Sequence, residues 1–160
     1  MVAPVALSVS VESLVAQLAE VLAPYPVALA YLFGSAATGQ MTPFSDVDIA
    51  LVVDETRPLP MSRLRFELEV EDELAARCGL SNADVRVINA APLLVRGEVV
   101  TYGKLLFARD DETRIEFETR TRMEYFDFLP VARFYQAAFF ENLRKRGLSG
   151  QRSKIARDAR

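Results

Sequence analysis

Two segments of strand length constrain the fold of this chain more than any other feature: the apolar run Val27–Phe33, and Val47–Val53, which is apolar apart from Asp48. The first run is continuous, without polar alternation, which is typical of a strand buried on both faces. Pro24 and Pro26 precede it and Gly34 follows it, so residues that interrupt regular structure bound it on both sides. The sequence therefore predicts two strands of a buried sheet within the first 53 residues.

Other segments predict the elements around this sheet. Between Ser10, a favourable N-cap, and Pro24, apolar residues recur at helical spacing and predict a helix. These residues are Leu14, Val15, Leu18, Val21 and Leu22. We expect further strands at Asp84–Ile88 and Lys104–Ala108, and further helices at 64–75 (ended by Gly79), 92–100, 110–128 and after Pro130. The result is an α/β chain with a helical C-terminal section.

The length of 160 residues favours one domain. We expect a core over residues 1–108, a helical section over 109–146 packed on the same domain, and a basic tail over 147–160. Residues 144–160 hold seven basic residues and one acid, a local charge of +6, and since the whole chain is −3 the rest carries −9. Such a tail can meet nucleic acid or an acidic partner, but a solvated terminus is the simpler interpretation.

The absence of histidine excludes several kinds of active site. Without it the chain has no Ser-His-Asp triad, no Cys-His pair and no imidazole metal ligand. Cys78 is the single cysteine, so an internal disulfide and a zinc cluster are also excluded, which suits a reducing compartment. The sequence shows no export or membrane signal, and we expect a soluble cytoplasmic protein.

Two aspartates mark the start of the second apolar run. Asp46 and Asp48 are two residues apart, and residues at this spacing on a strand point to the same face. Two such carboxylates repel each other and raise each other's pKa unless a cation lies between them. Oxygen ligands without nearby His or Cys favour Mg²⁺, with Mn²⁺ as an alternative.

Gly34 and Ser35 follow the first apolar run directly. A glycine there permits a tight turn and close approach of a ligand, and the Ser35 hydroxyl and backbone N–H groups can bind phosphate. Asp84 opens the short strand segment downstream and is the best candidate for a third carboxylate. A phosphate-binding turn beside a carboxylate metal site is what chemistry on a nucleoside triphosphate needs.

The pattern Gly34-Ser35, ten residues, then Asp46-x-Asp48, with Asp84 downstream, resembles the minimal nucleotidyltransferases of the DNA polymerase β superfamily. It is most similar to the MNT antitoxins of HEPN–MNT toxin–antitoxin pairs, over roughly residues 10–108. The resemblance implies a small mixed β-sheet flanked by helices, with ATP as substrate and two Mg²⁺ ions. It also implies transfer of AMP to a tyrosine of a HEPN ribonuclease toxin, which silences that toxin.

The same resemblance implies roles for single residues. Asp46, Asp48 and Asp84 would hold the metals and form the catalytic triad, while Gly34 and Ser35 would hold the triphosphate. The partners would be ATP and the toxin, in a hetero-oligomer, with neither membrane nor nucleic acid expected. Two metals would clamp the α-phosphate and activate the acceptor oxygen, and pyrophosphate would leave in line.

The chain departs from the family pattern at Thr38, where many relatives carry an arginine. Since all three carboxylates are present, we expect a change in affinity or rate and not a loss of activity. Two alternatives stay open: an antitoxin that neutralises its partner by stoichiometric binding alone, and a transferase with a small-molecule or RNA acceptor. Tyr31, Tyr102, Tyr125 and Tyr135 are potential self-acceptors, and nothing in the sequence selects one.

Overall fold

The computed structural model describes residues 11–38 and 46–146. The Ser10 cap, the loop after Thr38 and the basic tail 147–160 lie outside the described residues. Helices and strands follow one another as α1 (Val11–Leu22), β1 (Val27–Phe33), α2 (Gly34–Thr38), β2 (Val47–Val53), α3 (Arg63–Cys78), β3 (Ala83–Val87), α4 (Leu93–Tyr102), β4 (Lys104–Ala108) and α5 (Asp111–Arg146). The two strands expected from the long apolar runs have the expected bounds.

The four strands form one mixed sheet in the order β3-β2-β1-β4. β1 pairs antiparallel with both β2 and β4, and β2 pairs parallel with β3. A parallel pair needs a crossover connection, and α3 provides it between β2 and β3. The long apolar runs therefore form the two central strands of the sheet, where both edges are occupied by other strands.

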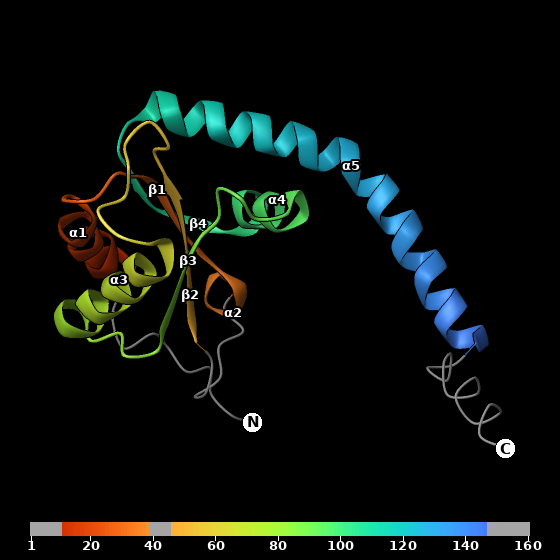
Figure 1. The fold of residues 1–160 in the computed structure, drawn as a ribbon, viewed down its shortest axis with the longest axis horizontal. Coiled ribbons are helices and arrows are strands. Elements are labelled where there is room, and N and C mark those ends of the chain that lie inside the picture. Colours follow the sequence, from red (N-terminus) through yellow and green to blue (C-terminus); the bar gives the residue numbers. More distant parts are fainter. Residues whose placement is uncertain (1–10, 39–45, 147–160) are drawn as a thin grey trace, which may run out of the picture. The chain divides into compact units, whose positions relative to one another are not determined.

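Helices cover both faces of the sheet (Figure 1). On one face α1 and α3 pack over a core that includes Leu18, Leu32, Ile49 and Phe66, each fully buried. On the other face α4 and the start of α5 pack over a smaller core that includes Tyr31 and Phe117. This double coverage explains why β1, and β2 apart from Asp48, are apolar and do not alternate.

Local signals set the limits of α3. The Ser62 hydroxyl accepts a hydrogen bond from the Arg65 N–H, a usual N-cap contact. Gly79 ends the helix in the left-handed conformation, with φ of 68°, and its N–H donates to the Leu74 carbonyl. These contacts agree with the helix end predicted at Gly79 and place β3 directly after the turn.

The last helix differs from the expectation. Pro130 was expected to separate two helices, but α5 runs unbroken from Asp111 to Arg146 with Pro130 inside it. A proline inside a helix removes one backbone hydrogen bond and either kinks or ends the helix, and here the helix continues past it. The chain divides within α5, after Tyr125, into two compact units. In the described part of the chain, no helix is both long and apolar enough to cross a membrane.

Candidate active site

The turn from β1 into α2 is shaped by Gly34. Its φ of 66° lies in the left-handed region, which residues with a side chain rarely adopt. A Cβ atom at this position would overlap the Asp48 carboxylate. Gly34 therefore satisfies two conditions together: it makes the turn, and it leaves room for the carboxylate of the neighbouring strand.

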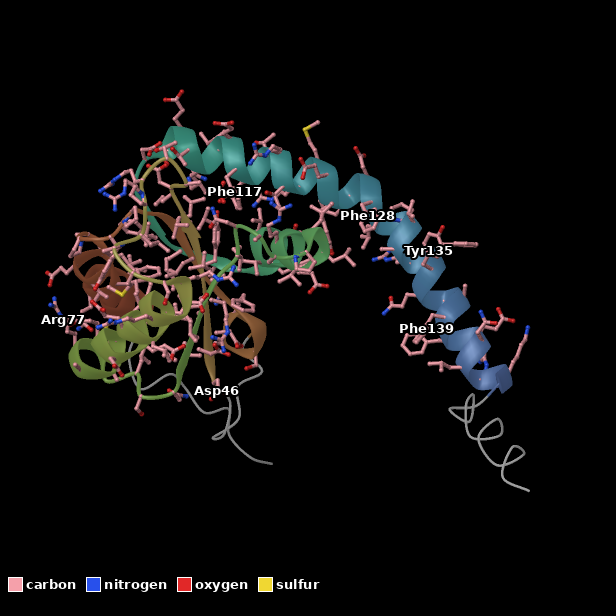
Figure 2. All side chains as sticks on the ribbon, viewed as in Figure 1. Asp46, Arg77, Phe117, Phe128, Tyr135 and Phe139 are labelled. Atoms are coloured by element: carbon pink, nitrogen blue, oxygen red, sulfur yellow. The ribbon has the colours of Figure 1, made fainter. Side chains whose placement is uncertain are left out.

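The sheet brings the three predicted aspartates to the same end. Phe33, the last residue of β1, is paired with Asp48 of β2, and Asp48 is in turn paired with Asp84 of β3. Residues directly opposite each other on neighbouring strands project to the same face. Asp46 precedes β2 and is exposed, and Figure 2 shows it at that end of the sheet. The expectation that the Asp84 strand lies beside β2 is thus confirmed.

The three carboxylates influence one another electrostatically. Burial raises the pKa of Asp48, and the negative charges of Asp84 and Asp46 raise it further. Arg86 lies two residues beyond Asp84 on β3, with its Nη2 atom 2.9 Å from Asp84 Oδ1. This guanidinium offsets part of the charge at Asp84, whereas no cation in the described part of the chain lowers the pKa of Asp48. A cation between the carboxylates would therefore be favourable.

The donor set fits a hard divalent cation. All three side chains are carboxylates, and carboxylate oxygens are the ligands that Mg²⁺ prefers. As the side chains stand, no three acidic or cysteine side chains among residues 11–38 and 46–146 are grouped closely enough to hold a metal ion. The Arg86 contact holds the Asp84 carboxylate, so metal binding would require this side chain to turn.

Two glutamates of α3 hold the strand that carries Asp84. β3 is an edge strand, and its outward N–H groups at Val85 and Val87 have no neighbouring strand. The Val85 N–H donates to Glu71 Oε1 at 2.9 Å, and the Val87 N–H donates to Glu67 Oε1 at 2.8 Å. Since Glu67 and Glu71 are one helical turn apart, α3 satisfies both donors and fixes β3 in place.

The described residues contain a cavity of about 340 Å³ beside Gly34. It is lined by Phe33, Gly34 and Ser35 from the turn and by Glu98 and Tyr102 from α4. Sequence reasoning missed Glu98 and named Tyr102 only among four tyrosines. Glu98 and Tyr102 are four residues apart, just before Gly103, and this spacing indicates that they share one face of a helix. Only the packing of α4 on the sheet shows which site that face borders.

A second cavity, also about 340 Å³, lies at the other end of β2, where Val53 and Asp54 line it together with Arg109 and Asp110. Several of its charged groups already have structural partners. The Arg109 side chain donates to the Val27 and Tyr25 carbonyls, and Asp110 accepts from the Thr113 N–H at the start of α5. We therefore place the candidate active site at the end of the sheet that carries Asp46, Asp48 and Asp84.

Comparisons with known proteins agree with this geometry. The family model described as Polymerase beta, Nucleotidyltransferase matches residues 16–112. A structure of a toxin–antitoxin with AMP-PNP contains a chain that is 23% identical, with a TM-score of 0.58, over 81% of this chain and 98% of that chain. A toxin–antitoxin MntA-HpeT mutant contains one that is 26% identical, with a TM-score of 0.58, over 82% and 97%.

A third solved structure is the tri-AMPylated Shewanella oneidensis HEPN toxin in complex with MNT antitoxin. Its matching chain is 21% identical, with a TM-score of 0.56, over 84% of this chain and 99% of that chain. No curated protein sequence gives a match. The family match covers more than half of the chain and confirms the resemblance drawn from Gly34, Ser35 and the aspartates. This protein belongs to the polymerase β nucleotidyltransferase family.

Proposed function

We propose that this chain is the antitoxin of a HEPN–MNT pair and transfers AMP from ATP to a tyrosine hydroxyl of its HEPN toxin. The observation that carries the proposal is the row of carboxylates, Asp48 paired with Asp84 and Asp46 beside them, against the Gly34 turn. The similar structures support the chemistry, because one was solved with AMP-PNP and another holds a tri-AMPylated HEPN toxin.

Each site residue has a role in this proposal. Asp46, Asp48 and Asp84 hold magnesium, which would supply positive charge at the α-phosphate and the acceptor oxygen. Gly34 makes the turn whose backbone faces the triphosphate, and Ser35 offers its hydroxyl and N–H to phosphate oxygens. Asp84 is also assigned to accept the proton of the tyrosine hydroxyl on a carboxylate oxygen, once its side chain has turned from Arg86 toward Asp48.

The reaction exchanges a phosphoanhydride bond of ATP for a phosphodiester bond to tyrosine. The tyrosine oxygen forms a bond to the α-phosphorus, and the bond between that phosphorus and the bridging oxygen of pyrophosphate breaks. The hydroxyl proton leaves to the carboxylate, and pyrophosphate departs with the bonding electron pair. No step requires an imidazole, which agrees with a chain that contains no histidine.

A protein partner is supported by the second unit of the chain. Along α5, Phe128, Val131, Tyr135 and Phe139 recur at helical spacing and are between 42% and 68% exposed. We call these four residues the α5 stripe, and Figure 2 labels three of them. An exposed apolar stripe of this kind is typical of a protein-binding helix, and we assign it to the HEPN toxin in a hetero-oligomer. ATP use and a free, buried Cys78 support a cytoplasmic location.

The test is transfer of label from ATP to the purified toxin. The complex is incubated with Mg²⁺ and ATP labelled at the α-phosphate, and intact mass and peptide mapping locate the label. We expect AMP on a toxin tyrosine, and we expect Asp46→Asn plus Asp48→Asn to lower the rate by more than about a hundredfold.

A matched control carries the same change of charge elsewhere. Asp54→Asn plus Asp72→Asn removes two carboxylates away from the Gly34 turn and should leave the rate within about twofold. Unchanged labelling in the Asp46/Asp48 variant would contradict the site assignment. Full neutralisation of the toxin by that variant without ATP would instead favour an antitoxin that acts by binding alone.

A further inference from the structure

The cavity beside Gly34 lies next to the row of carboxylates. Phe33 is paired with Asp48 across the sheet, so its side chain projects to the same face as that carboxylate. Phe33 also packs against the core that α4 covers, and it lines the cavity. A triphosphate held at Gly34 and Ser35 would therefore have the carboxylates on one side and this cavity on the other.

The α4 wall of the cavity is held in place by Gly103. A Cβ atom there would overlap the Val99 carbonyl oxygen and approach the Leu32 carbonyl oxygen of β1 to 2.9 Å. The Gly103 N–H also donates to the Val99 carbonyl at 2.8 Å. The end of α4 therefore packs closely against β1, the strand that leads into Gly34. This contact fixes the position of Tyr102 relative to the turn.

Two side chains of this wall face the cavity and are accessible to a ligand. Tyr102 lines the cavity and is 61% exposed, so its ring is open to a ligand. Glu98 is also exposed and stands one helical turn earlier, so both lie on the same side of α4. A planar ring and a carboxylate at one cavity wall match a ligand that is flat and carries hydrogen-bond donors at its edge.

We propose that this cavity binds the adenine ring of ATP, with Tyr102 stacking on the base and Glu98 accepting a hydrogen bond from its 6-amino group. This inference rests on the proposed function, because it names the base subsite of the same nucleotide site. Base–aromatic stacking and hydrogen bonds to a charged group are each strong enough to set nucleotide affinity. Glu98 and Tyr102 would then be binding residues that select the base.

The test measures binding of ATP, with Mg²⁺, to the full chain by titration calorimetry, without the toxin. We expect Tyr102→Ala to weaken binding about tenfold and Tyr102→Phe to weaken it less than about threefold, because the ring stacks and the hydroxyl does not. Phe134→Ala is the matched control: Phe134 is an aromatic residue that is 71% exposed on α5 outside the α5 stripe, and its loss should leave ATP affinity unchanged.

The role of Glu98 is tested by a double-mutant cycle with the ligand. Purine riboside triphosphate lacks the 6-amino group, and it should bind the native chain about tenfold more weakly than ATP. For Glu98→Ala the two nucleotides should bind equally, whereas Glu124→Ala, a change at an exposed residue of α5, should keep the difference. Circular dichroism and thermal unfolding check that each variant is folded.

The outcomes separate this inference from the proposed function. If toxin labelling occurs but the Tyr102 and Glu98 variants bind ATP like the native chain, the base subsite is wrong and the function stands. If labelling fails but the cycle behaves as expected, the cavity is a purine site and the proposed function is wrong. AMP attached to Tyr102 after incubation with ATP would overturn the stacking role, since its hydroxyl would then reach the α-phosphate.

Discussion

At the scale of single residues, the close approach of Gly34 to Asp48 explains why the Gly-Ser part and the Asp-x-Asp part of the motif occur together. Gly34 and Asp48 are 14 positions apart, but the pairing of β1 with β2 places Phe33 opposite Asp48. A side chain at position 34 would overlap the carboxylate, so the glycine and the aspartate have to occur together. The φ of Gly34 adds a conformational requirement that only glycine meets without strain.

A comparison of Gly34 with Gly79, which has the same backbone conformation, separates the effect of backbone strain from the effect of overlap with Asp48. Gly34 and Gly79 have φ of 66° and 68°, but nothing lies within 4 Å of a Cβ built on Gly79. We expect Gly79→Ala to lower the free energy of unfolding by about 1 kcal/mol through backbone strain, and Gly34→Ala to lower it by more, since the Asp48 side chain must also shift. Only Gly34→Ala should lower AMP transfer, by more than about tenfold. Equal transfer rates in the two variants would contradict the role assigned to Gly34.

The raised pKa of Asp48 predicts an unusual effect on stability. Its ordinary pKa is 3.8 when exposed, and burial with the charges of Asp84 and Asp46 raises the folded-state value. A raised carboxyl pKa stabilises the fold at low pH, and this stabilisation is lost as pH rises through the folded-state pKa. Asp48→Asn should therefore unfold at a higher temperature than the native chain at pH 7 without divalent metal. The difference should shrink as pH falls toward 3.8.

Asp54, just past the other end of β2, serves as a control because its pKa is shifted in the opposite direction. Hydrogen bonds from the Thr56 hydroxyl and N–H lower the pKa of Asp54 below 3.8. This stabilisation is present above pH 3.8 and is lost as pH falls through the lowered value. Asp54→Asn should therefore destabilise the chain at pH 7. Thermal unfolding from pH 4 to 7 in EDTA measures both, and a destabilised Asp48→Asn variant at pH 7 would contradict the first expectation.

At the scale of elements, α3 supplies hydrogen-bond acceptors to β3 at the open edge of the sheet, where no further strand in the described residues pairs with it. Glu67 and Glu71 accept the outward N–H groups of β3, which an edge strand otherwise leaves to solvent or to another chain. Arg86 connects the same helix to the site, because its guanidinium lies 3.8 Å from Glu67 and 2.9 Å from Asp84. The position of Asp84 thus depends on contacts with a helix that contributes no catalytic side chain.

A pair of glutamates on α3 tests this dependence. Glu71→Ala leaves the Val85 N–H without its acceptor, and we expect a loss of about 1–3 kcal/mol in the free energy of unfolding. Glu73→Ala removes only an exposed ion pair with Arg77, which is worth less than about 1 kcal/mol. Hydrogen exchange at Val85 should become faster in the first variant alone. If both variants exchange alike, the glutamate does not hold β3.

At the scale of the whole molecule, the two units differ in how they bury apolar side chains. Tyr125, the last residue of the first unit, is 3% exposed, and a Cβ on Gly97 of α4 would overlap its ring. The residues of the α5 stripe follow it and are at least 42% exposed. The first unit thus has its own core and the candidate active site, while the second unit offers the surface that we assign to the toxin.

Substitution of the α5 stripe should therefore affect the complex and not the site. Tyr135→Ser plus Phe139→Ser should weaken toxin binding by more than about tenfold, because buried aromatic side chains dominate protein interfaces. ATP affinity should stay unchanged. Leu64→Ser plus Leu68→Ser, on α3, removes two large apolar side chains that are 62% and 50% exposed and should leave toxin binding intact. Binding is measured by surface plasmon resonance, and equal losses in both variants would contradict the assignment.

Prediction from the sequence worked where the signal was local. The bounds of β1 and β2 follow from apolar runs, and the end of α3 follows from Gly79. It did not work at Pro130, because a proline inside a helix either kinks or ends it, and the local sequence does not distinguish these two outcomes. Glu98 and Arg86 were not found, since no short-range pattern indicates which distant segment a helix or strand residue will face.

The two central strands, the glycine turn and the carboxylate chemistry follow from the amino-acid sequence. They depend on periodicity and on residue types a few positions apart, which the backbone converts directly into geometry. Three further relations come from the folded chain: Asp84 pairs with Asp48, α3 holds β3, and α4 places Tyr102 beside Gly34. These relations depend on strand register and on packing between distant segments, which no local pattern specifies.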